Sequence, residues 1–253
     1  MDFTATFTRW FHRMASPRWF YRFARRWQPW FGWSSLLLLL VGAVWGLAFA
    51  PPDYLQGNSF RIIYIHVPAA ILAQSGYLLM ALAGGIGLIW RIKLAEMVAK
   101  SCAPIGASFT FLALVTGAIW GKPTWGTWWV WDARLTSELI LLFLYLGFMA
   151  LVESIDDVRR ADHAGALLAL VGAINVPIIY FSVKWWNTLH QGATISMTAA
   201  PKMAATMLQA MLLMTVAFWA YSFAVVFMRT RAIILERERQ AQWVRDLAAK
   251  EAA

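Results

Sequence analysis

The chain has 253 residues, of which 60% are hydrophobic and only 14% are charged. A soluble domain has roughly 45–50% apolar and about 25% charged residues, so this composition excludes an ordinary soluble protein and indicates that lipid is the main solvent. The net charge of +9 would suit nucleic-acid binding, but its distribution along the chain indicates membrane orientation instead. The single cysteine, Cys102, excludes an intrachain disulfide and any CxxC redox or zinc motif.

Six apolar stretches are long enough to cross a bilayer, which takes about 20 helical residues. Lipid offers the backbone no hydrogen-bond partner, so each stretch must be helical. We therefore predict an all-α integral membrane protein with six transmembrane helices. The predicted spans are Ser34–Ala50, Ala69–Trp90, Ala103–Trp120, Leu135–Val152, Ala164–Val183 and Met203–Met228.

The basic residues predict the orientation of these spans. Of the 22 lysines and arginines, 17 lie before the first span or after the second, fourth and sixth. Because positively charged segments stay in the cytoplasm, both termini are predicted to be cytoplasmic, and the loops after spans one, three and five are predicted to face outward. The outer segments contain only five basic residues, which are Arg61, Lys122, Arg134, Lys184 and Lys202.

The N-terminal segment 1–33 is basic and aromatic, and we expect it to lie along the cytoplasmic interface. The sequence Ala48-Phe49-Ala50 resembles a signal-peptidase site, but the basic region before it is long for a cleaved signal. Cleavage would also leave five helices with termini on opposite sides. We therefore predict a retained anchor, a six-span membrane domain over 34–228 and a charged cytoplasmic tail over 229–253.

Two of the four histidines, His66 and His190, are predicted to lie at a similar depth on the outer face. His66 precedes Pro68, which suits the first turn of a helix. Neutral imidazole is a strong ligand for haem iron, and two imidazoles can fill both axial positions. Each histidine could equally be a structural hydrogen-bonding group. His12 and His163 lie among charges on the cytoplasmic side and are interpreted as solvated surface residues.

The third outer segment, 120–136, contains five tryptophans within twelve residues. If the chain is helical from Thr124 onward, then Trp125, Trp128, Trp129 and Asp132 share one face. Such a face would be a flat aromatic surface on which a porphyrin could be buried, since each ring buries about 150–250 Å². The alternative is an aromatic belt that anchors the loop among the lipid headgroups. Gly121 and Gly126 would permit close approach of a ligand.

The stretch from Trp120 to Glu138, with Trp128-Trp129-Val130-Trp131-Asp132 at its centre, resembles the tryptophan-rich WWD signature of haem-handling proteins. The six spans, one histidine before the signature and one after it in Trp-Trp-Asn-Thr-Leu-His-Gln are similar to the cytochrome c maturation protein C (CcmC) family. The similarity extends over nearly the whole chain. It implies that His66 and His190 are axial ligands of haem iron. The haem-holding residues that it implies are Trp120, Trp125, Trp128, Trp129, Trp131 and Asp132.

The resemblance also implies a function and partners. The protein would bind haem b transiently on the outer, periplasmic face of a bacterial inner membrane and present it to a membrane-tethered haem chaperone, which supplies apocytochrome c. Further expected partners are an ABC-type ATPase, its membrane subunit and a small single-span subunit. The chain has no GxxxxGK[ST] motif, so a partner would hydrolyse the ATP, and we expect no enzymatic activity here.

Haem has two propionates, so cations are expected near the aromatic surface. Arg134 is a candidate, although it could instead pair with Asp132 or Glu138. Three other functions remain as alternatives: the larger synthetase branch of the same family, a bis-histidine b-type cytochrome, and a transporter permease. The permease would need polar residues at mid-membrane, where the spans offer only Gln74, Asn175 and Gln209.

Overall fold

The computed structural model describes residues 15–190 and 203–251 and confirms an all-α architecture. Six helical segments are long and apolar enough to cross a membrane, as the sequence predicts. Strand pairing in the described residues is limited to one isolated bridge, between Asp53 and Gly57. In chain order, the elements are α2 (Pro17–Val44), η1 (Trp45–Phe49), η2 (Asn58–Ile62), α3 (Ile63–Trp90), α4 (Lys93–Trp125), α5 (Ala133–Glu153), α6 (Val158–Gly172), α7 (Asn175–Trp185), α8 (Ala205–Arg237) and α9 (Gln242–Glu251).

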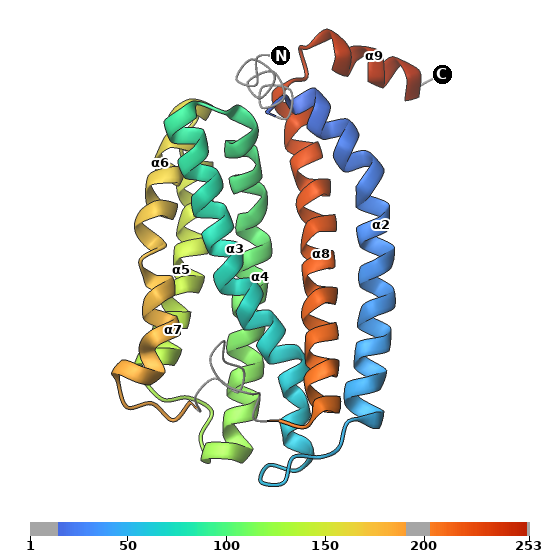
Figure 1. The fold of residues 1–253 in the computed structure, drawn as a ribbon. Helices are drawn as coiled ribbons and strands as arrows, with labels where there is room; N and C mark the ends of the chain where they lie inside the picture. Colours follow the sequence, from blue (N-terminus) through green and yellow to red (C-terminus); the bar gives the residue numbers. More distant parts are fainter. Residues whose placement is uncertain (1–14, 191–202, 252–253) are drawn as a thin grey trace, which may run out of the picture.

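The helices form an elongated bundle in which α2 and α8 run side by side in opposite directions (Figure 1). The second group consists of α3 to α7, and α3 and α4 pack against α8. The start of α2 and the C-terminal α9 lie at one end of the bundle. The segments that follow η1, α4 and α7 lie at the opposite end. Residues that are far apart in sequence therefore meet at this second end, away from the described ends of the chain.

The fifth predicted span consists of two helices, α6 and α7, separated at Ala173 and Ile174. Pro177 explains the break, because a proline ring lacks an N–H group and clashes with the carbonyl four residues earlier, here that of Ala173. That carbonyl instead accepts from the backbone N–H of Val176 at 3.1 Å. Asn175, at the start of α7, donates from Nδ2 to the carbonyl of Ser137 at 2.9 Å and so attaches the break to α5.

Two predicted helix boundaries differ from the structure. The first span does not start at Ser34, because α2 is continuous from Pro17, where a proline suits the first helical position. The expectation that Pro68 lies in the first turn of a helix was wrong. The 3₁₀ helix η2 leads directly into α3 at Ile63, so Pro68 lies within the helix and the carbonyl of Tyr64 loses its usual N–H partner.

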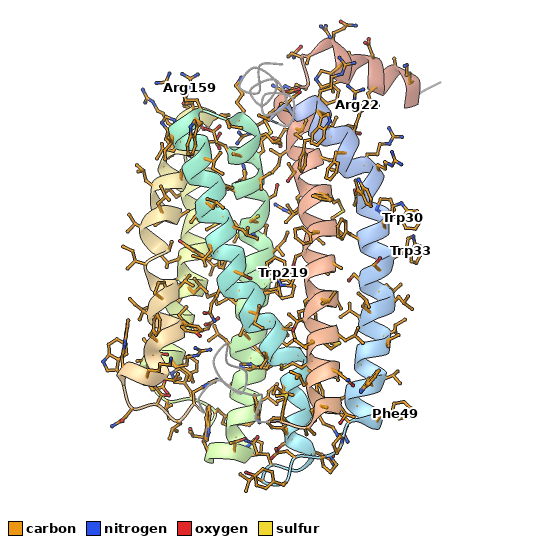
Figure 2. All side chains as sticks on the ribbon, viewed as in Figure 1. Arg22, Trp30, Trp33, Phe49, Arg159 and Trp219 are labelled. Atoms are coloured by element: carbon orange, nitrogen blue, oxygen red, sulfur yellow. The ribbon has the colours of Figure 1, made fainter. Side chains whose placement is uncertain are left out.

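The outer surface of α2 is apolar and aromatic, as a lipid-facing helix requires. Trp30 and Trp33 are 69% and 72% exposed, and they point away from the bundle, as does Phe49 in η1 (Figure 2). Leu37 and Leu40 are likewise exposed on the same helix. In water such a surface would favour aggregation, whereas in a bilayer it is the expected lipid contact.

The core of the α3–α7 group is built around Tyr77 and Tyr145, whose rings are fully buried and meet edge to face at 4.9 Å. The Tyr145 hydroxyl donates to the carbonyl of Ala73 at 2.8 Å, joining α5 to α3. Gly106 on α4 and Gly172 on α6 make room for the two rings, because a Cβ at either position would overlap a tyrosine. Small residues thus let these helices approach closely, which is how membrane helices gain packing energy.

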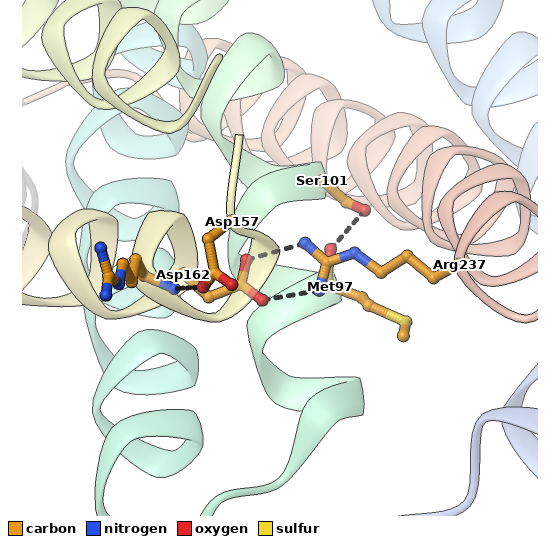
Figure 3. A network of polar contacts seen from close by, with 6 residues as sticks. Met97, Ser101, Asp157, Asp162 and Arg237 are labelled. Carbon is orange, nitrogen blue, oxygen red and sulfur yellow. Dashed lines mark hydrogen bonds and ion pairs between the residues drawn. The ribbon is translucent and has the colours of Figure 1, made fainter. Parts of the chain in front are cut away.

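A buried ion pair joins α6 to α8 at the end of the bundle that carries the chain termini. Arg237 donates from Nη1 and Nη2 to the two carboxylate oxygens of Asp162, both at 2.7 Å (Figure 3). The Asp162 side chain is 4% exposed. Close by, Ser101 donates to the carbonyl of Met97 within α4. Because the pair is bidentate and shielded from water, removing one partner leaves an uncompensated buried charge.

We predict that Asp162→Ala lowers the stability of the folded protein by about 3–5 kcal/mol, the usual cost of breaking a buried ion pair. The control is Glu153→Ala, which removes the exposed pair between Glu153 and Lys100 (3.6 Å) and should cost about 0–1 kcal/mol. The measurement is the thermal unfolding midpoint of each purified variant in detergent. Equal midpoints for the two variants would show that the Asp162–Arg237 pair does not hold α6 to α8.

Candidate functional site

A pocket opens at the end of the bundle opposite the start of α2 and α9, between α3, α4, α5 and the segment after α7. Its empty space is about 640 Å³ when the open mouth is included, whereas the enclosed cavity volume is about 50 Å³. We call it the histidine pocket. Its lining comprises Gln56, His66, Ala70, Ala113, Leu114, Gly117, Ala118, Trp120, Thr124, Trp125, Trp129, Arg134, Leu135, Glu138 and His190.

The two predicted histidines come together in this pocket although they are far apart in sequence. The ring centres of His66 and His190 are 6.5 Å apart, with an angle of 35° between the ring planes. His66 belongs to α3, and His190 follows the end of α7. By contrast, His163 lies in α6, outside the pocket lining. His12 lies outside the described residues.

Each histidine ring also contacts a tryptophan of α4. Trp120 meets His66 edge to face at 5.6 Å, and its Nε1 donates to Oε1 of Gln56 at 2.6 Å. Trp125 lies 6.2 Å from His190, measured between ring centres. Because Trp120 and Trp125 are both carried by α4, this helix forms the wall that faces both imidazoles.

The expectation that the chain is helical from Thr124 onward was wrong. Helix α4 ends at Trp125, because Gly126 adopts the left-handed conformation (φ +78°) that terminates helices and that glycine favours. Gly121 is needed for close approach, since a Cβ there would lie 3.0 Å from the Trp125 ring and 3.2 Å from the Thr127 carbonyl oxygen. The segment thus folds back on α4 instead of continuing as a helix.

The irregular segment 126–132 divides its tryptophans between two surfaces. Trp129 is half-buried, lines the histidine pocket, and has an Nε1 with no hydrogen-bond partner among the described residues. Trp128 and Trp131 are 56% and 77% exposed and lie outside the lining. The predicted single face of Trp125, Trp128 and Trp129 is therefore not formed, because the chain leaves the helix before it is complete.

Asp132 was predicted to belong to the ligand-holding surface, but it is not in the pocket lining. It is the N-cap residue of α5, and its Oδ1 accepts from the backbone N–H of Leu135 at 2.8 Å. Its second oxygen, Oδ2, is buried without a hydrogen-bond partner in the described part of the chain. Such caps stabilise a helix by typically 0.5–2 kcal/mol, so Asp132 fixes where α5 begins and thereby where Arg134 lies.

Arg134 and Glu138 lie one turn apart on α5 and both line the pocket. Arg134 donates from Nη1 to the carbonyl of Ile179 in α7 at 2.8 Å. The ion pairs found in the described residues do not include one between Arg134 and Asp132 or Glu138. Glu138 is 7% exposed, and neither of its carboxyl oxygens has a hydrogen-bond partner among the described residues. A buried polar group without a partner is costly, so its position against the pocket indicates a site for polar ligand groups.

The other predicted outer cations have local roles. Arg61 donates from Nη1 to the carbonyls of Gly46 and Leu47 and thereby ties η2 to η1. Lys122 donates to the carbonyl of Gly126 at 3.1 Å, and the Lys184 ammonium lies 5.8 Å from the ring centre of Phe181. Lys202 lies outside the described residues. Of the described outer cations, Arg134 alone lines the pocket.

Sequence reasoning did not assign a role in the site to Gly117 and Glu138, which line the pocket, or to Thr116, which contacts His66 from outside the lining. Thr116 Oγ1 lies 3.1 Å from His66 Nδ1, and a Cβ at Gly117 would lie 3.0 Å from His66 Cε1. Their spacing from residues already assigned to the site could have indicated them. Thr116 and Gly117 precede Trp120 by four and three residues, which places them on the same helix face. Glu138 follows Arg134 by four residues, so a helical α5 presents both to one side.

The fold and the pocket together define a class of protein: a polytopic membrane protein with an aromatic, paired-histidine pocket at one end of its bundle. Comparison with known proteins gives the family. The family model described as heme exporter protein C (CcmC) matches residues 10–245. The chain belongs to this family.

Curated relatives agree with the family match over almost their whole length. Heme exporter protein C of Escherichia coli K12 is 49% identical over 240 residues, which cover 94% of this chain and 96% of the relative. The Haemophilus influenzae protein of the same name is also 49% identical over 240 residues, covering 95% and 98% of the two chains. The Paracoccus denitrificans protein is 40% identical over 233 residues, covering 92% and 96%.

We predict that Asp132→Ala destabilises the protein by about 0.5–2 kcal/mol, because it removes the side-chain cap of α5. Asp132→Asn is the matched control, since an asparagine oxygen can accept the same bond from the Leu135 N–H. Thermal unfolding in detergent would measure both. If Asp132→Asn is as destabilised as Asp132→Ala, the negative charge rather than the cap is what the fold requires.

Proposed function

We propose that this protein handles haem during cytochrome c maturation: it binds haem transiently between His66 and His190 and presents it to a membrane-tethered haem chaperone. The related proteins are named heme exporters, which describes a transport component rather than an enzyme. The observation that carries the proposal is the approach of two imidazoles from distant parts of the chain within an aromatic pocket.

The spacing of the two imidazoles fits one metal ion between them. A metal–nitrogen bond is about 2.0 Å, and the ring centre lies roughly 1.1 Å further, so two axial imidazoles would place their centres about 6 Å apart. The centres of the His66 and His190 rings are 6.5 Å apart. Neutral imidazoles at this separation can fill both axial positions of a haem iron.

The rest of the pocket suits the remainder of a porphyrin. Trp120, Trp125 and Trp129 offer aromatic rings to the flat apolar macrocycle. Arg134 is the cation within reach of a propionate, and the Trp129 Nε1 is a further donor. The pocket opens at the end of the bundle, which favours exchange of haem b with a partner over permanent retention.

The distribution of charge supports a location in the bacterial inner membrane with the pocket facing the periplasm. The start of α2, the α3–α4 and α5–α6 connections with the start of α4, the end of α8 and the segment through α9 lie at the end remote from the pocket (Figure 1). These regions and the N-terminal segment contain 17 of the 22 basic residues. The positive-inside rule assigns that end to the cytoplasm. Both termini would then be cytoplasmic.

The exposed tryptophans supply a surface for the chaperone. Trp128 and Trp131 lie beside the pocket but are mostly exposed, and tryptophan is enriched at binding interfaces. A chaperone that docks on them would reach the haem at the mouth of the pocket. The name shared by the relatives also suggests an exporter complex, in which we propose an ABC-type ATPase, its membrane subunit and a small single-span subunit as partners.

We predict that His66→Ala and His190→Ala each lower haem retention by about 10–100-fold or more, because losing an iron ligand should cost at least as much as losing an outer-shell partner. His163→Ala is the matched control, since His163 lies outside the pocket. The measurement is the haem absorbance per protein after purification of each variant. Retention that falls for His163→Ala but not for His66→Ala would contradict the proposed ligands.

We further predict that two tryptophan pairs act at different steps. Trp125→Ala with Trp129→Ala should lower haem affinity about 100-fold or more, because each buried aromatic side chain contributes roughly 1.5–3 kcal/mol. Trp128→Ala with Trp131→Ala should keep haem bound but slow its transfer to the chaperone. Haem titration and the rate of covalent chaperone loading separate the two steps. Identical defects in both double variants would mean that the segment acts as one surface.

A further inference from the structure

We propose that Thr116 is a positioning residue that fixes the tautomer of His66, so that Nδ1 carries the proton and Nε2 presents a lone pair to the pocket. Thr116 on α4 contacts His66 on α3, and no sequence motif marks this contact. Its consequence for haem rests on the function proposed above. The tautomer itself is a property of the protein without haem.

The hydrogen bonds of Thr116 determine which way the contact runs. Its hydroxyl donates to the carbonyl of Leu112 at 2.6 Å, with the carbonyl of Ala113 further away at 3.3 Å. A hydroxyl has one proton, and its shortest contact assigns that proton to the carbonyl of Leu112, which can only accept. With the proton placed there, the threonine oxygen accepts from His66 Nδ1, 3.1 Å away. In this arrangement Nδ1 is the donor.

The neutral His66 ring then has a single tautomer. With the proton on Nδ1, the lone pair of the imidazole lies on Nε2 at the far side of the ring. Only this unprotonated nitrogen can bind iron. His66 and His190 both line the pocket, with their ring centres 6.5 Å apart. Thr116 therefore selects the one neutral form of His66 that presents Nε2 as a ligand.

Two neighbours of Thr116 on α4 hold the plane of the same ring. Gly117 lets the His66 ring lie against the helix backbone, since a Cβ there would approach Cε1 to 3.0 Å. Trp120, one turn further on, contacts the ring edge to face at 5.6 Å. One turn of α4 thus sets the protonation, depth and orientation of the imidazole. Among these three, Thr116 alone provides a side-chain hydrogen-bond acceptor to the ring, and the backbone of Ala113, three residues earlier, also hydrogen-bonds His66.

The expected chemical effect is that of an outer-shell partner. A hydrogen bond from the second ring nitrogen orients a ligating histidine and raises its basicity, and loss of such a partner typically costs 10–100-fold in affinity. Greater basicity favours ferric over ferrous iron, so removing the bond should also raise the reduction potential of bound haem. Thr116 contacts the His66 ring, so the effect should act through that one axial ligand.

The first test uses full-length protein without haem, labelled with ¹⁵N-histidine and studied by NMR in detergent at about pH 8, where imidazole with an ordinary pKa near 6.5 is neutral. His66→Gln assigns the signal. We expect His66 to be predominantly Nδ1-protonated in the wild type and in Thr116→Ser, and to shift towards the Nε2-protonated form in Thr116→Val. A wild-type His66 protonated mainly on Nε2, or no change in Thr116→Val, would overturn the inference.

A matched control removes a hydroxyl of the same kind from the same helix. Thr110 is also buried on α4, and its hydroxyl donates to the carbonyl of Gly106 at 2.7 Å without contacting a histidine. Thr110→Val should therefore leave the His66 tautomer unchanged while causing a comparable loss of a backbone contact. An equal tautomer shift in Thr110→Val would show that the effect is a general loosening of α4.

The second test adds haem. We expect Thr116→Val to lower haem affinity about 10–100-fold and to raise the reduction potential, with recovery in Thr116→Ser and no change in Thr110→Val. Normal affinity and potential in Thr116→Val, despite a shifted tautomer, would refute the role in haem binding. Failure of the proposed function is distinguishable, because His66→Ala would then retain haem while the tautomer result would stand.

Discussion

The close approach of α3 to α4 is the constraint on which the pocket depends. Near the middle of the bundle, a Cβ at Gly76 of α3 would lie 3.9 Å from the Cα of Gly106 on α4. Towards the end of the bundle, Gly117 allows the His66 ring to lie against the backbone of α4. Larger residues at these positions would separate the helices and move His66 away from Thr116. The close helix packing that small residues allow in a membrane thus determines where the His66 imidazole lies.

The second half of the pocket is assembled by irregular backbone at the end of the bundle, where water can satisfy groups that lipid cannot. Gly126 ends α4, and Asp132 starts α5, so the intervening segment turns Trp129 inward and leaves Trp131 exposed. His190 also lies in irregular backbone, a few residues after the end of α7. A pocket built in this way is anchored on rigid helices and remains open to partners, which is the combination that handling of a transient cargo requires.

The number of helices, their approximate positions and the separation of charge were predictable from the sequence, because hydropathy and the positive-inside rule act on long segments. The pairing of His66 with His190 was expected from topology, and the structure places them together. The prediction that the tryptophans share one helix face was wrong, because Gly126 adopts a left-handed conformation and ends the helix. The contact of Thr116 with His66 spans fifty residues, and local spacing contains no information about such a pairing.

We propose that one haem iron is bound by His66 and His190 together. Pulsed EPR of the ferric haem complex, prepared from ¹⁵N-histidine-labelled protein, is a direct test because it detects the histidine nitrogens bound to the iron. We expect a low-spin spectrum with hyperfine coupling to two histidine nitrogens, one of which is lost in each single alanine variant. A high-spin spectrum, or coupling to a single histidine that survives in both variants, would contradict it.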